Sequence, residues 1–145
     1  MKFIADAMLG RLAKRMRLLG IDVFYDPTLN DNGIIRLSLE QDRVILTRDK
    51  TLSARPLAMK HLFIESERVE EQWKQVRSSF PTKIFPFTRC SECNEPLVSI
   101  AKDEVRDLVP QYVCEKNTIF FQCPACSRIY WPGTHVSKME RLKLQ

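Results

Sequence analysis

All five cysteines of this 145-residue chain lie beyond residue 89, and four of them form two Cys-x-x-Cys pairs. The pairs are Cys90/Cys93 and Cys123/Cys126, with 29 residues between them. Two residues between thiolates let both sulfurs reach one ion, and two such pairs complete a closed tetrahedral site. This pattern predicts a structural zinc ion and a small zinc-ribbon module in the second part of the chain.

Free thiols or a redox pair are the alternatives for these cysteines, but paired Cys-x-x-Cys motifs favour zinc. The spacing exceeds the roughly 15–20 residues of common zinc ribbons, and a helix around 102–108 accounts for the extra length. Cys114 belongs to neither pair, and we expect it to be a buried apolar side chain. His135 is an alternative ligand, although four thiolates already suffice.

The first 80 residues alternate between short β-like runs and amphipathic helical stretches. Parallel strands need crossover connections, which helices supply. The order therefore predicts an α/β fold with a mostly parallel sheet flanked by helices. The predicted strands are 2–5, 21–25, 43–47 and 62–65, and the predicted helices are 7–19, 69–80 and one from Asn30 or Asp31 to about Gln41.

A change in composition predicts the domain organisation. Residues 1–80 form the α/β domain, residues 81–87 contain two prolines and form a linker, and residues 88–145 hold the ribbon and a C-terminal extension. Within the ribbon, 118–121 and 128–131 are β-like. No apolar run approaches the roughly 18 residues of a membrane span, and Asp6 interrupts any early signal core. We therefore expect a cytoplasmic protein.

Positive charge is concentrated in the first part of the chain. Residues 1–89 carry 16 Lys and Arg against 11 Asp and Glu, whereas residues 90–145 carry seven of each. A basic surface attracts polyanions because neutralised phosphates release counterions. A solvated basic face without a partner is the alternative interpretation.

Two aspartates stand at the carboxyl ends of two predicted strands. Asp6 ends the first strand and Asp49 follows the third. Because the carboxyl ends of parallel strands border one crevice, we expect these carboxylates to lie close together, with Asp31 beside them. Clustered carboxylates repel one another without a cation, and Mg²⁺ or Mn²⁺ prefers oxygen ligands. A purely local role for each, as a helix cap or turn residue, is the alternative.

Basic side chains follow Asp6 on the first predicted helix, where no acid intervenes before Ile21. Like charges one turn apart repel, so a bound polyanion would stabilise this face. An ordinary solvent-exposed amphipathic face is the alternative. The stripe consists of Arg11, Lys14, Arg15 and Arg17.

Taken together, the motifs resemble those of the Mut-seven C-terminal RNase domain family, a PIN-like nuclease group. The resemblance covers nearly the whole chain. It is carried by the segments 3–6, 8–13, 18–23, 25–27 and 46–49, by Arg89-Cys90-x-x-Cys93-Asn94, and by 102–105, 109–110, 121–126 and 129–135.

This resemblance implies a PIN-like domain followed by a zinc ribbon, and a divalent-metal-dependent ribonuclease. By position, it places the acidic site on Asp6, Asp31 and Asp49. Glu65 or Glu67 is a candidate fourth acid, and Asn32 stands where a second acid beside Asp31 is expected.

The leading hypothesis is therefore a ribonuclease that hydrolyses single-stranded RNA with Mg²⁺ or Mn²⁺ held by the three aspartates. Arg11, Lys14, Arg15 and Arg48 would bind substrate phosphates. Tyr130 and Trp131 would either stack on bases or belong to the ribbon core, which we favour. A non-catalytic RNA- or ribosome-binding module with a structural zinc ribbon is the alternative function.

Overall fold

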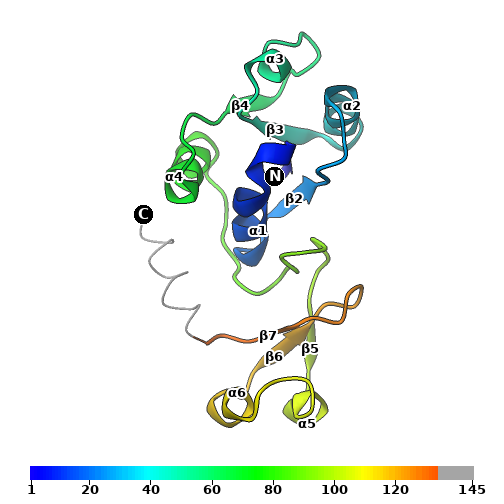
Figure 1. Cartoon of the computed structure of the whole chain (residues 1–145), viewed down its shortest axis with the longest axis vertical. Coiled ribbons are helices and arrows are strands. Elements are labelled where there is room, and N and C mark those ends of the chain that lie inside the picture. Colours follow the sequence, from blue (N-terminus) through cyan, green and yellow to red (C-terminus); the bar gives the residue numbers. More distant parts are fainter. Residues whose placement is uncertain (134–145) are drawn as a thin grey trace.

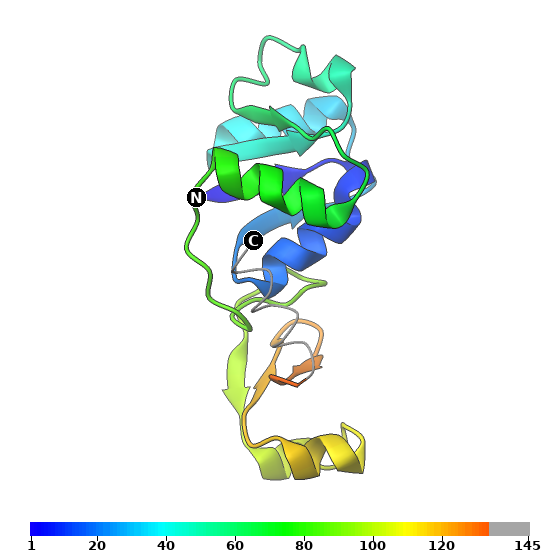
Figure 2. The same cartoon turned by 90° about the vertical axis from the view of Figure 1, so that its left-hand side faces the viewer.

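The computed structural model describes residues 1–133, with an α/β domain at one end and the cysteine module at the other (Figures 1 and 2). Four strands of the α/β domain form one parallel sheet in the order β2-β1-β3-β4. The predicted parallel sheet is confirmed, and β1 and β3 form its centre. The strands are β1 (Lys2–Ala5), β2 (Asp22–Tyr25), β3 (Arg43–Thr47) and β4 (His61–Phe63).

Helices cover both faces of this sheet, because successive side chains of a strand point to opposite sides. Phe3 and Leu46 are buried with α1 and α4 on one face, and Ile4 and Ile45 are buried with α2 and α3 on the other. No helix in residues 1–133 combines the length and apolar character of a membrane span. The helices are η1 (Ala7–Leu9), α1 (Gly10–Leu18), α2 (Asp31–Gln41), α3 (Lys50–Ser53) and α4 (Val69–Ser79).

Two local features differ from the sequence prediction. The helix predicted over 7–19 begins with the separate 3-10 turn η1, because the Asp6 side chain caps the N–H of Met8. Between the third and fourth strands the sequence leaves a helix optional and without bounds, since the four residues of α3 are too few to show a helical period. Both differences lie directly after strands, where short turns redirect the chain.

The cysteine module consists of a three-stranded antiparallel sheet in the order β5-β6-β7 with two short helices inserted. The sequence predicts one helix around 102–108, but Pro110 precedes a second one that was not predicted. Val105, Val113 and Phe120 form its small core. The elements are β5 (Val98–Ile100), α5 (Lys102–Val105), α6 (Gln111–Lys116), β6 (Phe120–Gln122) and β7 (Ile129–Tyr130).

The buried side chain of Arg17 joins the two modules. Its guanidinium donates to the carbonyl of Val23 at 2.9 Å and to those of Ser91 and Glu92 at 3.0 and 3.1 Å. The side-chain oxygen of Asn94 also accepts the backbone N–H of Val23 at 3.1 Å. The first Cys-x-x-Cys turn therefore packs directly on β2 and the end of α1.

The segment predicted as a linker contains no helix or strand and lies along the end of α1. The backbone N–H of Phe85 donates to the carbonyl of Leu19 at 2.9 Å. Gly20 has a φ of +85°, and a Cβ there would lie 2.3 Å from the Phe85 carbonyl oxygen. Only glycine accommodates both the left-handed backbone and this close crossing.

We expect Arg17→Met to lower the free energy of unfolding by about 2–4 kcal/mol, because carbonyls of both modules lose their donor. Urea denaturation followed by tryptophan fluorescence measures this loss. Lys14→Met is the matched control on the same helix, since Lys14 makes an exposed ion pair with Glu92 and its loss costs less than about 1 kcal/mol. Equal losses in the two variants would contradict the joining role of Arg17.

Candidate functional site

The strand order creates a crevice at the carboxyl ends of β1 and β3. The chain leaves β1 toward β2 on one side and returns as β3 on the other side. In open parallel sheets, ligands bind where the connections diverge in this way. Asp6 directly follows β1, and its backbone N–H donates to the carbonyl of Leu46 in β3 at 3.0 Å.

The carboxylate of Asp6 is buried and held by three donors. One oxygen accepts the backbone N–H of Met8 at 2.9 Å. The other accepts the hydroxyl of Thr47 and the backbone N–H of Arg48, the latter at 3.0 Å. No Lys or Arg of the described chain forms an ion pair with Asp6, so its negative charge is stabilised by dipoles and left without a counter-ion.

Thr47 connects Asp6 to Asp49. Its hydroxyl donates to Asp6 and accepts the backbone N–H of Asp49 at 2.9 Å. The Asp49 carboxylate caps α3 by accepting the N–H of Thr51 at 2.8 Å. Asp6, through its carboxylate, and Asp49, through its backbone N–H, thus both contact the hydroxyl at the end of β3. The sequence analysis did not identify Thr47 as a site residue. Its signal in the sequence is its place as the last residue of a buried strand, two positions before Asp49.

Asp31 is the first residue of α2, which begins after β2 at the same edge of the sheet. The helix is capped by Asn30, whose side chain accepts the N–H of Gly33 at 2.8 Å. Asn30 therefore performs the capping role, and in residues 1–133 Asp31 makes no side-chain hydrogen bond or ion pair of its own. Asn32 instead accepts a hydrogen bond from Arg55 at 2.8 Å.

Asp6, Asp31 and Asp49 do not form a ligand cluster as close as that of the four cysteines. Within the described chain, the four cysteines form the only group of three or more possible ligands whose ligand atoms all lie within 4.8 Å of one another. The joint role of Asp6, Asp31 and Asp49 as a metal site stays a prediction.

Most of the predicted phosphate-binding side chains contact acids of this protein. Lys14 pairs with Glu92 at 3.0 Å, and Arg15 pairs with Glu70 at 3.4 Å. Arg11 is exposed and forms no ion pair within the described residues. The four residues of the basic stripe therefore differ in their environment. Arg17 is buried, Lys14 and Arg15 are paired with glutamates, and Arg11 is exposed without an ion-pair partner in the described chain.

Arg48 turns toward the segment after β4, where both candidate fourth acids lie. Its guanidinium donates to the carbonyl of Glu65 at 2.8 Å and lies 3.8 Å from the carboxylate of Glu67. Glu67 borders a cavity that also includes Ala7 and Met8, the residues directly after Asp6. Of the two glutamates, Glu67 is thus the one placed beside this edge of the sheet.

The four cysteines of the two pairs converge on one point, as predicted. Each pair ends in a left-handed residue, Asn94 or Ser127, whose N–H donates to the carbonyl of the first cysteine of its pair at 2.9 Å. Two equivalent turns therefore present four sulfurs to a common centre. This donor set fits a closed structural metal site such as zinc.

The electrostatics of the sulfur cluster favour a bound cation. The backbone N–H of Arg128 lowers the pKa of the Cys126 thiol to about 6. Hydrogen bonding to Cys126 raises the pKa of the Cys93 thiol to about 12. Four thiols so close together cannot all ionise unless a metal ion takes up their charge.

The two ribbon aromatics have structural contacts. The hydroxyl of Tyr130 lies 3.0 Å from the sulfur of Cys90 and accepts the backbone N–H of Ser91 at 3.1 Å. Burial raises the pKa of Tyr130 to about 12. Trp131 packs against the ribbon core. Trp131 thus belongs to the ribbon core as predicted, whereas Tyr130 contacts the first Cys-x-x-Cys turn and is not among the residues of that core.

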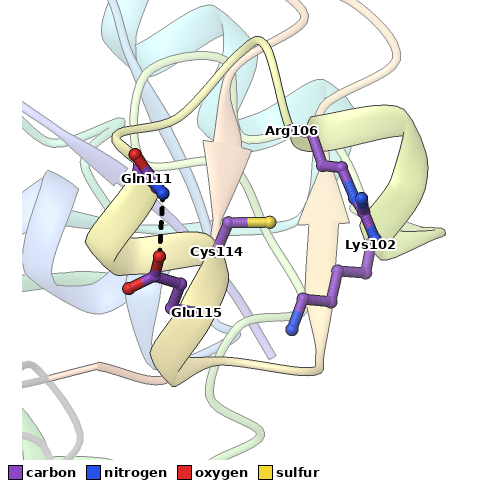
Figure 3. Close-up of a pocket in the computed structure, with 5 residues that line it drawn as sticks. All are labelled: Lys102, Arg106, Gln111, Cys114 and Glu115. Carbon is purple, nitrogen blue, oxygen red and sulfur yellow. Dashed lines mark hydrogen bonds between the residues drawn. The ribbon is translucent and has the colours of Figure 1, made fainter.

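A second cavity, of about 490 Å³, lies between α5 and α6. Figure 3 shows the thiol of Cys114 pointing from α6 toward Lys102 of α5 and Arg106, the residue directly after α5, with Gln111 and Glu115 on the other side. The burial predicted for Cys114 is confirmed, and it is not part of the four-sulfur cluster. His135 lies outside the described residues.

The sequence model of one protein family, described as Mut7-C RNAse domain, matches residues 1–143. The chain belongs to this family. The match spans both the parallel sheet and the cysteine module, so the two parts belong to one family unit. No curated protein and no solved structure gives a significant match.

We expect purified protein to retain about one zinc ion per chain. Cys93→Ser removes one ligand and should lower the zinc content and unfold the ribbon, because metal binding and folding are coupled. Elemental analysis and circular dichroism measure both effects. Cys114→Ser is the matched control and should retain zinc, whereas a fully folded, zinc-free protein would contradict the assignment.

Proposed function

We propose that this protein is a divalent-metal-dependent ribonuclease that hydrolyses phosphodiester bonds of single-stranded RNA. One observation carries the proposal: Asp6 is buried at the crevice between β1 and β3, beside Asp49, without a cationic side chain of the described chain to neutralise it. Membership in an RNase domain family supports the same class of reaction.

The donor set suits a hard cation such as Mg²⁺ or Mn²⁺. Mg²⁺ keeps several water molecules and uses one or two protein carboxylates together with substrate phosphates. Asp6 and Asp49 supply such a pair, and Asp31 stands at the same edge to contribute through water. When bound, the ion would lower the pKa of a water molecule and stabilise charge on the leaving oxygen.

The protein's own residues prepare this site. The hydroxyl of Thr47 and the N–H groups of Met8 and Arg48 fix the orientation of the Asp6 carboxylate. The first turn of α3 fixes Asp49 through the N–H of Thr51. Two acids held by backbone donors are preorganised, so little free energy is spent on ordering them when a cation arrives.

The basic side chains and the thiols complete the proposal. The basic face of α1 would bind RNA phosphates, with Arg11 as its available cation. All five cysteines are free thiols in the structure, which suits zinc binding in a reducing compartment. We therefore propose the cytoplasm as the location.

We expect Asp6→Asn and Asp49→Asn each to lower Mn²⁺-dependent cleavage by about 100-fold or more, because each removes a charged ligand. Cleavage of a fluorescent single-stranded RNA measures the rate. Asp42→Asn is the matched control, since Asp42 is exposed and pairs with Lys60 away from the crevice. It should keep full activity.

Asp31→Asn separates the third acid from the other two. If Asp31 contributes to the site, its loss should slow cleavage without changing stability, because Asn30 caps α2 independently. Equal cleavage by wild type, Asp6→Asn and Asp49→Asn would contradict the nuclease proposal. Salt-sensitive RNA binding that needs no Mg²⁺ and yields no products would instead support the non-catalytic RNA-binding alternative.

A further inference from the structure

A cavity of about 660 Å³ lies against the residues that follow Asp6, between the start of α1 and the start of α4. Ala7 and Met8 form one wall, and the ring of Tyr25 at the end of β2 forms another. Such a volume lies within the range of small-ligand sites. The cavity is thus large enough for part of a polymeric substrate that continues past Asp6.

Tyr25 shapes this cavity by crossing over the start of α1. Its hydroxyl donates to the carbonyl of Ala7 at 3.0 Å. A Cβ at Gly10 would lie 2.8 Å from the Tyr25 oxygen, so a larger residue there would displace the ring. The position of the Tyr25 ring is therefore fixed by these contacts, and the cavity that it borders is preformed.

The charges around the cavity are not balanced evenly. Both glutamates that line the cavity have an arginine neighbour within 4 Å, and the lining residue Arg68 pairs with Glu71, whereas Arg11 lines the cavity without an ion-pair partner in the described chain. An anion entering here would therefore meet one uncompensated cation. The three pairs are Arg48 with Glu67 at 3.8 Å, Arg15 with Glu70 at 3.4 Å, and Arg68 with Glu71 at 3.5 Å.

We propose that this cavity is a subsite for the nucleotide adjacent to the scissile bond, and that Arg11 binds its phosphate. The proposal rests on the ribonuclease function proposed above and adds the path of the RNA away from the acids. Ala7 and Met8 line the cavity and directly follow Asp6 in the chain. An RNA strand bound at Asp6 could therefore continue along the cavity wall to Arg11. Arg11 therefore binds a neighbouring phosphate, while the phosphate to be cleaved lies at Asp6 and Asp49.

The test measures RNA binding as a function of salt in an Asp49→Asn background, in which the RNA stays intact. A single-stranded oligonucleotide of fixed length is the probe, and fluorescence anisotropy reports its affinity. Arg11→Gln should lower the slope of log affinity against log salt by about 0.7, the value for one phosphate contact to a single strand. Arg11→Lys keeps the charge and should restore most of the slope.

Arg36→Gln is the matched control, because Arg36 is an exposed arginine on α2, on the opposite face of the sheet. It should leave the slope unchanged. An unchanged slope in Arg11→Gln, an equal decrease in Arg36→Gln, or no RNA binding by the Asp49→Asn protein would overturn the subsite. These outcomes are measured by RNA binding and do not depend on cleavage. Failure of the nuclease proposal is detected in a separate assay, in which wild-type protein yields no cleavage products.

A second measurement keeps the proposal testable if Arg11→Gln does not fold. Oligonucleotides that carry one neutral methylphosphonate linkage at successive positions are bound to the Asp49→Asn protein with Arg11 intact. Loss of affinity confined to one linkage supports a single phosphate contact in this cavity, and Arg11→Lys should keep the same profile. An even profile across all linkages would contradict it.

Discussion

The buried carboxylate of Asp6 is the constraint on which the candidate site depends. Three donors fix its oxygens, yet no Lys or Arg of the described chain neutralises it. Burying a charge is costly unless it is hydrogen-bonded and compensated, and within residues 1–133 only the first condition is met. The strand order places Asp49 at the same edge of the sheet, where the two acids would together offer a cation its oxygen ligands in the proposed function. The chemistry proposed for this protein follows from that uncompensated charge.

Arg17 ties the four-cysteine cluster to the α/β domain through hydrogen bonds to the first Cys-x-x-Cys turn. It lies in α1, which begins four residues after Asp6, and it donates to carbonyls within the first Cys-x-x-Cys turn. Zinc would hold that turn in the shape that Arg17 contacts, so metal binding in the ribbon supports α1 from its far end. The two metals proposed for this chain thus have different tasks: zinc would stabilise the assembly of the modules, and Mg²⁺ or Mn²⁺ would perform chemistry at the sheet.

Features with a simple period or spacing could be predicted from the sequence, and features that depend on distant partners could not. The parallel sheet, the convergence of the cysteines and the shared edge of Asp6 and Asp49 follow from strand order and ligand spacing. The role of Thr47 depends on the register between β1 and β3, which no local pattern encodes. In the sequence Arg17 resembles the other residues of the basic stripe, but its acceptors lie up to 75 residues away. For the same reason, the sequence did not reveal which basic side chains pair with glutamates and which one stays available.

Manganese anomalous scattering from crystals soaked in MnCl₂ tests the central claim most directly, because it locates the ion without relying on activity. We expect a manganese peak about 2–2.5 Å from a carboxylate oxygen of Asp6, with Asp49 bound directly or through water, and a separate zinc peak among the four cysteines. A well-ordered crevice without a manganese peak, or a Lys or Arg side chain seated on Asp6 in its place, would contradict it.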